Sequence, residues 1–252
     1  GSDADIIVFE TMTDIYEVKA AVLAARENSD KPIIVTMTFE ENRRTFTGCD
    51  IPSMAITLNG LGVSAIGLNC SLGPKELLPI IGELSKWTNL PLVVKPNAGL
   101  PDPITNTYDI TPEEFASYVA DMANYGIRVV GGCCGTNPEY IKATIKKLST
   151  IHPNVEKKEI PSAVCSSSKT VVINQPRIIG ERINPTGKKR FKEALKNNDL
   201  DYILGQAIEQ AQGGAEILDV NVGLPGIDEK EMMIKTVKAL QGVTNLSLIH
   251  IS

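Results

Sequence analysis

The stretch Ala65-Ile66-Gly67-Leu68-Asn69-Cys70 is an apolar run that ends in a reactive side chain. A helical pattern follows it at Pro74–Lys86. The same succession, a short apolar run and then an amphipathic segment, recurs over residues 1–150. Strands that are buried on both faces and alternate with helices are typical of a parallel sheet, so we expect an α/β fold.

The neighbouring runs end in the same way. The other apolar runs are Ile6–Glu10, Ile33–Phe39, Leu92–Asn97 and Arg128–Gly132. The helical patterns that follow are Ile15–Glu27, Ser53–Leu61, Pro112–Tyr125 and Pro138–Leu148. Polar residues stand at or just after the run ends: Glu10, Cys70, Asn97, Cys133 and Cys134. In a (βα)8 barrel the chemistry gathers at that face, and closing such a barrel needs about three further units, which we expect upstream.

A second βα rhythm begins after a break. The pattern lapses over residues 151–175, which we interpret as a linker. Strand patterns then occur at Arg177–Gly180 and Ala215–Val222, and helical patterns at Phe191–Gly213, with a break near Asn197-Asn198-Asp199, and at Glu229–Gln241. We therefore predict two (βα)8 barrels of the TIM type, both incomplete: the C-terminal part of one over residues 1–150, and the N-terminal part of another over residues 176–252.

The last seven residues, Leu246–Ser252, match the translation of a common transposon-library adapter. We expect them to be read-through from a cloned fragment. The alternative is a genuine third strand, because the run is apolar. Sequencing the source DNA past Ser252 distinguishes the two.

Composition excludes several classes of protein. The 252 residues are 42% hydrophobic and 22% charged, which is ordinary for a soluble globular protein. A net charge of −5 provides no basic patch for nucleic acid, and no apolar run approaches the roughly 20 residues that span a bilayer. The N-terminus has no secretory-signal pattern, and five unevenly placed cysteines do not form a disulfide framework. We expect a cytoplasmic protein.

The segment Gly131-Gly132-Cys133-Cys134-Gly135 places two adjacent cysteines in a glycine turn. Together with Cys70, three thiolates from two strand ends can hold a zinc ion and leave its fourth position open. A substrate thiol that enters this position loses its proton and stays nucleophilic at neutral pH, which is the chemistry of sulfur alkylation. Asn97 is placed to be a weak fourth ligand that the substrate displaces. Buried thiols or a strained vicinal disulfide are the alternatives, and Cys49 and Cys165 are interpreted as incidental.

Three segments resemble the homocysteine-binding domain of cobalamin-dependent methionine synthases: Leu68-Asn69-Cys70-Ser71-Leu72-Gly73-Pro74, Val94-Lys95-Pro96-Asn97-Ala98-Gly99 and Gly131-Gly132-Cys133-Cys134-Gly135-Thr136. The resemblance implies that Cys70, Cys133 and Cys134 bind zinc and act in catalysis, and that Asn97 is the displaceable ligand. Val8-Phe9-Glu10-Thr11 is similar to the segment whose glutamate lies near the homocysteine amino group. Glu10 is therefore a candidate for substrate binding, although a carboxylate there can equally cap a helix. The family's glycine-rich first strand is absent.

The second half resembles the pterin-binding domain of the same family, at Gly180–Gly187 and Gly214–Gly223. The resemblance implies that Glu181, Asn184, Asp219 and Asn221 contact the pterin of methyltetrahydrofolate. Alternatively, Glu181 and Arg182 form a structural ion pair at the barrel rim. The family's last strand ends in an acid–hydroxyl pair where this sequence has His250-Ile251-Ser252, and its main pterin contacts come from later strands.

The resemblance implies a methyltransferase fragment. Homocysteine activated by zinc takes a methyl group from methylcobalamin to give methionine, and methyltetrahydrofolate is the methyl donor through the second barrel. A cobalamin-binding module would belong to the same parent chain outside this sequence, and we expect the fragment alone to be inactive. One alternative is a stand-alone homocysteine S-methyltransferase that uses betaine or S-methylmethionine, against which the second rhythm argues. The other is a non-catalytic zinc or redox protein.

Overall fold

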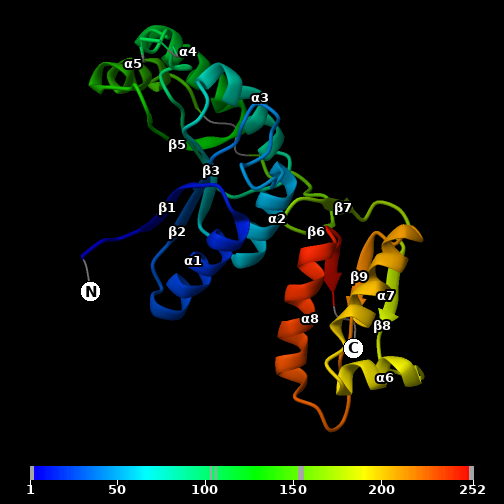
Figure 1. The fold of residues 1–252 in the computed structure, drawn as a ribbon. Helices are drawn as coiled ribbons and strands as arrows, with labels where there is room; N and C mark the ends of the chain where they lie inside the picture. Colours follow the sequence, from blue (N-terminus) through cyan, green and yellow to red (C-terminus); the bar gives the residue numbers. More distant parts are fainter. Residues whose placement is uncertain (1–2, 103, 106, 153–155, 250–252) are drawn as a thin grey trace. The chain divides into compact units, whose positions relative to one another are not determined.

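The computed structural model describes residues 3–102, 104–105, 107–152 and 156–249. The chain forms two compact units, residues 1–160 and 161–252, and each contains a parallel sheet whose successive strands are joined through helices (Figure 1). The predicted α/β class is therefore confirmed. Within the described ranges, no helix is long and apolar enough to cross a membrane.

The first unit is a sheet of five parallel strands in the order in which they occur along the chain. The strands are β1 (Ile7–Met12), β2 (Ile33–Met37), β3 (Ala65–Asn69), β4 (Leu92–Lys95) and β5 (Ile127–Val130). The helices that follow them are α1 (Ile15–Asn28), α2 (Ile51–Leu61), α3 (Pro74–Leu84), α4 (Pro112–Met122) and α5 (Pro138–Leu148), with a short 3₁₀ turn at Ala123–Tyr125. Each predicted run of this half is a strand or a helix.

Short polar side chains start most of these helices. The carboxylate of Asp14 accepts hydrogen bonds from two backbone N–H groups of α1, and that of Asp50 accepts one from the backbone N–H of Ser53 in α2. Thr111 and Glu114 form a reciprocal capping box at α4, and Asn137 caps α5. These caps satisfy N–H groups that have no partner inside the helix, so each strand-to-helix turn has a defined end.

Two long-range contacts show that the first sheet curves. Adjacent strands lie about 4.8 Å apart, so the side chains of β1 and β4 would stand roughly 14 Å apart on a flat sheet. Glu10 on β1 nevertheless forms an ion pair with Lys95 on β4. The Asn69 side chain at the end of β3 likewise reaches over β2 to the backbone N–H of Thr11, at 2.9 Å. The strand ends therefore converge.

The core lies at the middle strands and the helices packed on them. All five residues of β3 are buried, whereas β1 has only exposed and partly buried positions and β5 buries only Ile127. The two edge strands expose Val8 and Val129. This is the pattern of an open sheet, and the closed barrel remains a prediction.

The second unit begins inside the segment that we expected to be a linker. Residues 163–165 and 170–172 form an antiparallel hairpin, β6 (Ala163–Cys165) and β7 (Thr170–Val172). A parallel sheet follows with β8 (Ile179–Ile183), β9 (Ile217–Val220) and β10 (Ser247–Ile249). Its helices are α6 (Lys189–Lys196), α7 (Leu200–Gln212) and α8 (Glu229–Val243). The expected break in the long helical pattern separates α6 from α7, where Asn198 has a φ of 53°.

The C-terminal run forms a strand as far as it is described. β10 pairs in parallel with β9, and the hydroxyl of Ser247 donates a hydrogen bond to the carbonyl oxygen of Cys165. Residues 250–252, which include His250-Ile251-Ser252, lie outside the described residues. An apolar run pairs with a free strand edge whatever its origin, so the adapter hypothesis for residues 246–252 stays a prediction.

Candidate metal and thiol-binding site

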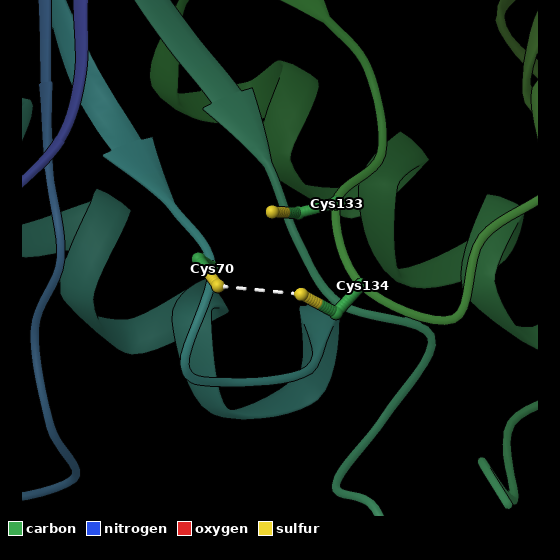
Figure 2. Close-up of side chains that lie close together, drawn as sticks. All are labelled: Cys70, Cys133 and Cys134. Atoms are coloured by element: carbon green, nitrogen blue, oxygen red, sulfur yellow. Dashed lines mark hydrogen bonds between the residues drawn. The ribbon is translucent and has the colours of Figure 1, made fainter.

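Three cysteine sulfurs meet at the carboxyl ends of β3 and β5. Cys70 directly follows β3, and Cys133 and Cys134 lie in the loop between β5 and α5. Their Sγ atoms all lie within 4.8 Å of one another, and those of Cys70 and Cys134 are 3.7 Å apart. Figure 2 shows the three side chains pointing toward a common space. All three carry free thiols, so the geometry is not that of a vicinal disulfide.

The loop after β4 holds the two cysteine-bearing loops together. The backbone N–H of Cys133 donates to the carbonyl oxygen of Pro96 at 2.7 Å, and the N–H of Ala98 donates to that of Cys134 at 2.9 Å. On the other side, the N–H of Asn97 donates to the carbonyl oxygen of Leu72 at 3.0 Å. The three loops thus form one hydrogen-bonded layer above the sheet, which fixes the spacing of the sulfurs.

The backbone around the cysteines adopts conformations that most residues avoid. Cys70 and Ser71 have φ values of 63° and 62°, in the left-handed region. Such strain costs of order 1 kcal/mol or more per residue and persists only where surrounding contacts enforce it. Gly135 also has a positive φ, 79°, and a Cβ there would lie 2.3 Å from the ring of Tyr108. The left-handed turn at Cys70 directs its sulfur toward the other two.

Asn97 lies within this layer and is buried. Its side-chain oxygen accepts a hydrogen bond from the backbone N–H of Cys134 at 3.1 Å. An amide oxygen has two acceptor positions, so one remains. The structure therefore brings Asn97 to the cysteines, where it supports the Cys134 backbone. Its role as a displaceable ligand stays a prediction.

The sulfurs influence one another and a neighbouring phenol. Burial, and then the adjacent Cys70 thiol, raise the pKa of Cys133 above the ordinary value of a thiol. Partial burial, and then the charges of Cys134, Cys70 and Cys133, raise the pKa of Tyr108. A thiol with a raised pKa is protonated at neutral pH, so a metal that binds it must displace its proton.

The donor set fits zinc. Tetrahedral zinc with Zn–S bonds of about 2.3 Å places its sulfurs roughly 3.7 Å apart. The Cys70–Cys134 separation of 3.7 Å matches this value. The other sulfur pairs lie within 4.8 Å, so they need to approach by at most about 1 Å to bind the same ion. Three thiolates leave one tetrahedral position for a fourth ligand.

Glu10 is not a helix cap. Asp14 caps the helix that follows, while the Glu10 carboxylate is ion-paired with Lys95. About half of the Glu10 side chain is exposed, at 55%, and Lys95 packs its stem over Gly131, just before the two cysteines. Sequence reasoning missed Lys95, although a lysine in an otherwise apolar strand was a signal.

The four predicted pterin residues lie on two adjacent strands of the second unit. Glu181 and Asp219 belong to β8 and β9, and Asn184 and Asn221 directly follow these strands. Each asparagine oxygen accepts the backbone N–H two residues on, from Thr186 at 2.9 Å and from Gly223 at 2.8 Å. The parallel pairing of β8 with β9 places all four toward one end of the sheet.

The alternative prediction of an ion pair between Glu181 and Arg182 was wrong. Glu181 does not pair with Arg182. Its carboxylate oxygens instead lie 3.4 Å from the ammonium group of Lys188, and the Arg182 backbone N–H donates to the side chain of Gln210.

Comparison with known proteins identifies the family. Residues 1–148 match the family model for homocysteine S-methyltransferase. The chain belongs to the homocysteine S-methyltransferase family. Residues 180–252 match a second family model, that of pterin binding enzymes. The three clustered cysteines lie in the homocysteine S-methyltransferase part, and the four candidate pterin residues lie in the other.

Two curated relatives match both parts of the chain. It is 34% identical over 239 residues to methionine synthase from Mycobacterium leprae (strain TN), which covers 88% of this chain. It is 34% identical over 236 residues to methionine synthase from Mycobacterium tuberculosis (strain ATCC 25618 / H37Rv), which covers 89% of this chain. The chain spans about a fifth of the length of each relative, 20% in both cases.

Solved structures that match part of this chain include the homocysteine methyltransferase MmuM from Escherichia coli. Its metallated form is 25% identical, with a TM-score of 0.49, and the match covers 57% of this chain and 46% of that chain. Its oxidized form is 26% identical, with a TM-score of 0.49, over 57% and 45% of the two chains.

Proposed function

We propose that the first unit binds zinc through Cys70, Cys133 and Cys134 and presents the thiol of homocysteine for methylation. The observation that carries this proposal is the convergence of three free thiols within 4.8 Å at the ends of two strands, in a member of the homocysteine S-methyltransferase family. Zinc in such a site lowers the pKa of a bound thiol, so that the thiolate is available as a nucleophile at neutral pH.

The other residues of the site orient the substrate and the ligands. Asn97 supports the backbone of Cys134 and has one acceptor position left, which suits a weak ligand that a substrate sulfur replaces. Glu10 can accept the ammonium group of an amino acid once its ion pair with Lys95 is exchanged. The freed Lys95 ammonium group then suits the substrate carboxylate.

The second unit extends the proposal to the methyl donor. Its match to pterin binding enzymes, and the similarity of both units to methionine synthases, support methyltetrahydrofolate as the donor and Glu181, Asn184, Asp219 and Asn221 as pterin contacts. Transfer through methylcobalamin would use a cobalamin-binding module of a longer parent, in the cytoplasm. We propose that both units are portions of (βα)8 barrels. The second match argues against a stand-alone enzyme that uses betaine or S-methylmethionine.

The experiment that tests the thiol-binding step is calorimetric titration of the chain with homocysteine, before and after loading with zinc. Binding that requires zinc and releases a proton from the thiol is expected, because only the thiolate is a zinc ligand. Homoserine, which replaces the sulfur by oxygen, is the control and should not bind detectably. Equal binding of homocysteine with and without zinc would contradict the proposal.

Replacing Asn97 with alanine should weaken zinc binding by about tenfold, the lower end of the range for groups that support metal ligands. The substitution removes the acceptor of the Cys134 N–H but leaves all three thiolates. Competition with a chromophoric chelator measures the affinity. Asn59→Ala is the matched control, because Asn59 also braces loops, at Trp87 and Thr88. A loss as large as that from removing a thiolate would contradict the assignment of Asn97 as a weak ligand.

A further inference from the structure

The side chain of Asn69 lies at a junction of three strands. It is the last residue of β3, directly before Cys70, and is 2% exposed. Its side-chain oxygen accepts the backbone N–H of Thr11 at 2.9 Å and the hydroxyl of Thr36 at 2.7 Å. Its side-chain nitrogen donates to the hydroxyl of Thr11 at 2.7 Å. One amide thus connects β1, β2 and β3.

The remaining N–H of this amide faces a sulfur. Asn69 Nδ2 lies 4.0 Å from Cys133 Sγ, in the loop after β5. An amide has two N–H donors and two acceptor positions, and three of these four are occupied by Thr11 and Thr36. The threonine contacts hold the amide in one orientation, so its last donor is directed at Cys133. A donor that faces an ionised sulfur forms a stronger, charge-assisted hydrogen bond.

We propose that Asn69 is a positioning residue for Cys133: its amide, fixed by the two threonines, donates an N–H···S hydrogen bond to the Cys133 thiolate when the site holds zinc. The hydrogen bond orients this sulfur toward Cys70 and Cys134 and offsets part of the negative charge of three thiolates. It also links the metal site to β1, since Thr11 adopts a φ of 60° at the irregularity between Phe9 and Met12. This inference rests on the zinc site proposed above.

A purely structural role for Asn69 predicts different behaviour. If Asn69 only braced the strands, substituting it would lower the stability of the fold. Substituting its partner Thr36 would then have the same kind of effect. A donor to sulfur must also alter the metal–thiolate bond itself. Asn69→Asp separates these roles, because it keeps the acceptor for Thr11 and Thr36 but replaces the N–H donors by a second carboxylate oxygen beside Cys133. Thr36→Val is the matched control, because it removes a hydrogen bond to the same amide on the side away from sulfur.

The test compares the parent chain, Asn69→Asp and Thr36→Val. We expect Asn69→Asp to weaken zinc affinity by about 10- to 100-fold and to shift the sulfur-to-cobalt charge-transfer band after cobalt substitution. Thr36→Val should keep the zinc affinity within about threefold and leave the band in place. Equal effects of the two variants, or an Asn69→Asp variant with parental affinity, would overturn the inference. If the unsubstituted chain still bound zinc through its three cysteines, the proposed function would stand even though this inference had failed.

A measurement on the unaltered chain covers the case in which Asn69→Asp does not fold. With ¹¹³Cd in place of zinc and ¹⁵N in the protein, an N–H···S–Cd hydrogen bond transmits a scalar coupling from the metal to the amide proton. We expect one side-chain proton of Asn69 to correlate with ¹¹³Cd. Cadmium bound by three cysteines without this correlation would overturn the inference alone. Failure of the parent to bind zinc or cadmium at the three cysteines would overturn the proposed function and this inference together.

Discussion

Replacing Cys133 with alanine is expected to reduce the zinc affinity of this chain by roughly 100-fold or more. Structural zinc sites contribute about 10–16 kcal/mol over four ligands, so one thiolate accounts for about 3 kcal/mol, and each 1.4 kcal/mol is a factor of ten. The site offers three clustered sulfurs, so none of them is spare. Chelator competition measures the loss.

Cys165→Ala is the control for this substitution. It makes the same chemical change at a cysteine of the β6–β7 hairpin, in the other unit. Its zinc affinity should equal that of the parent. If the two variants lost affinity equally, or if Cys133→Ala kept the parental affinity, Cys133 would not be a ligand.

In a longer enzyme that contains this chain, Cys133→Ala should affect only one of the two methyl-transfer half-reactions. We expect Cys133→Ala to abolish methyl transfer to homocysteine, because the thiol is no longer activated. Methyl transfer from methyltetrahydrofolate to cobalamin should survive, because the pterin candidates lie in a separate unit. Single-turnover assays of each half-reaction measure this, and an equal loss of both would contradict the division.

The second large effect is expected from Gly67→Ala, which should lower the free energy of unfolding of the first unit by about 3 kcal/mol. A Cβ at Gly67 would lie 1.8 Å from the carbonyl oxygen of Val93, its partner on β4. Backbone atoms cannot move aside as a flexible side chain can, so β3 and β4 must separate. These are the strands that carry Cys70 and the loop of Asn97.

Urea unfolding followed by tryptophan fluorescence measures this change. Trp87 is the single tryptophan of the sequence and packs against the core of the first unit, so its fluorescence reports on that unit. Gly60→Ala is the control. Gly60 is an exposed residue of α2 with no atom within 4 Å of its added Cβ, so the change should be neutral or stabilising by up to about 1 kcal/mol. An unchanged urea midpoint for Gly67→Ala would show that the two strands are not in such close contact.

Local sequence patterns predicted most of the helices and strands. The helical pattern that begins at Pro112 is α4, which starts at that residue behind the Thr111–Glu114 capping box. The break near Asn197-Asn198-Asp199 separates α6 from α7 as expected. Such features depend on residues a few positions apart, which a sequence displays directly. The β6–β7 hairpin was missed because its strands have only three residues each.

The clustering of the three cysteines was predictable from the sequence, and the contacts that support them were not. Cys70 and the Cys133-Cys134 pair stood at the ends of recognisable strands, so their convergence followed from a parallel sheet. The contacts of Asn69 join residues 58 and 64 positions away, at Thr11 and Cys133. The Glu10–Lys95 ion pair spans 85 positions and depends on the curvature of the sheet. Curvature is set by tertiary packing, which no short pattern encodes.

The most direct test of the account is X-ray absorption at the zinc edge of the loaded chain, before and after addition of homocysteine. The account predicts three sulfur neighbours at about 2.3 Å with one nitrogen or oxygen neighbour, and four sulfur neighbours once homocysteine is bound. Fewer than three sulfur neighbours in the loaded chain, or a sulfur count that homocysteine leaves unchanged, would contradict the claim that these cysteines form a zinc site that binds the substrate thiol.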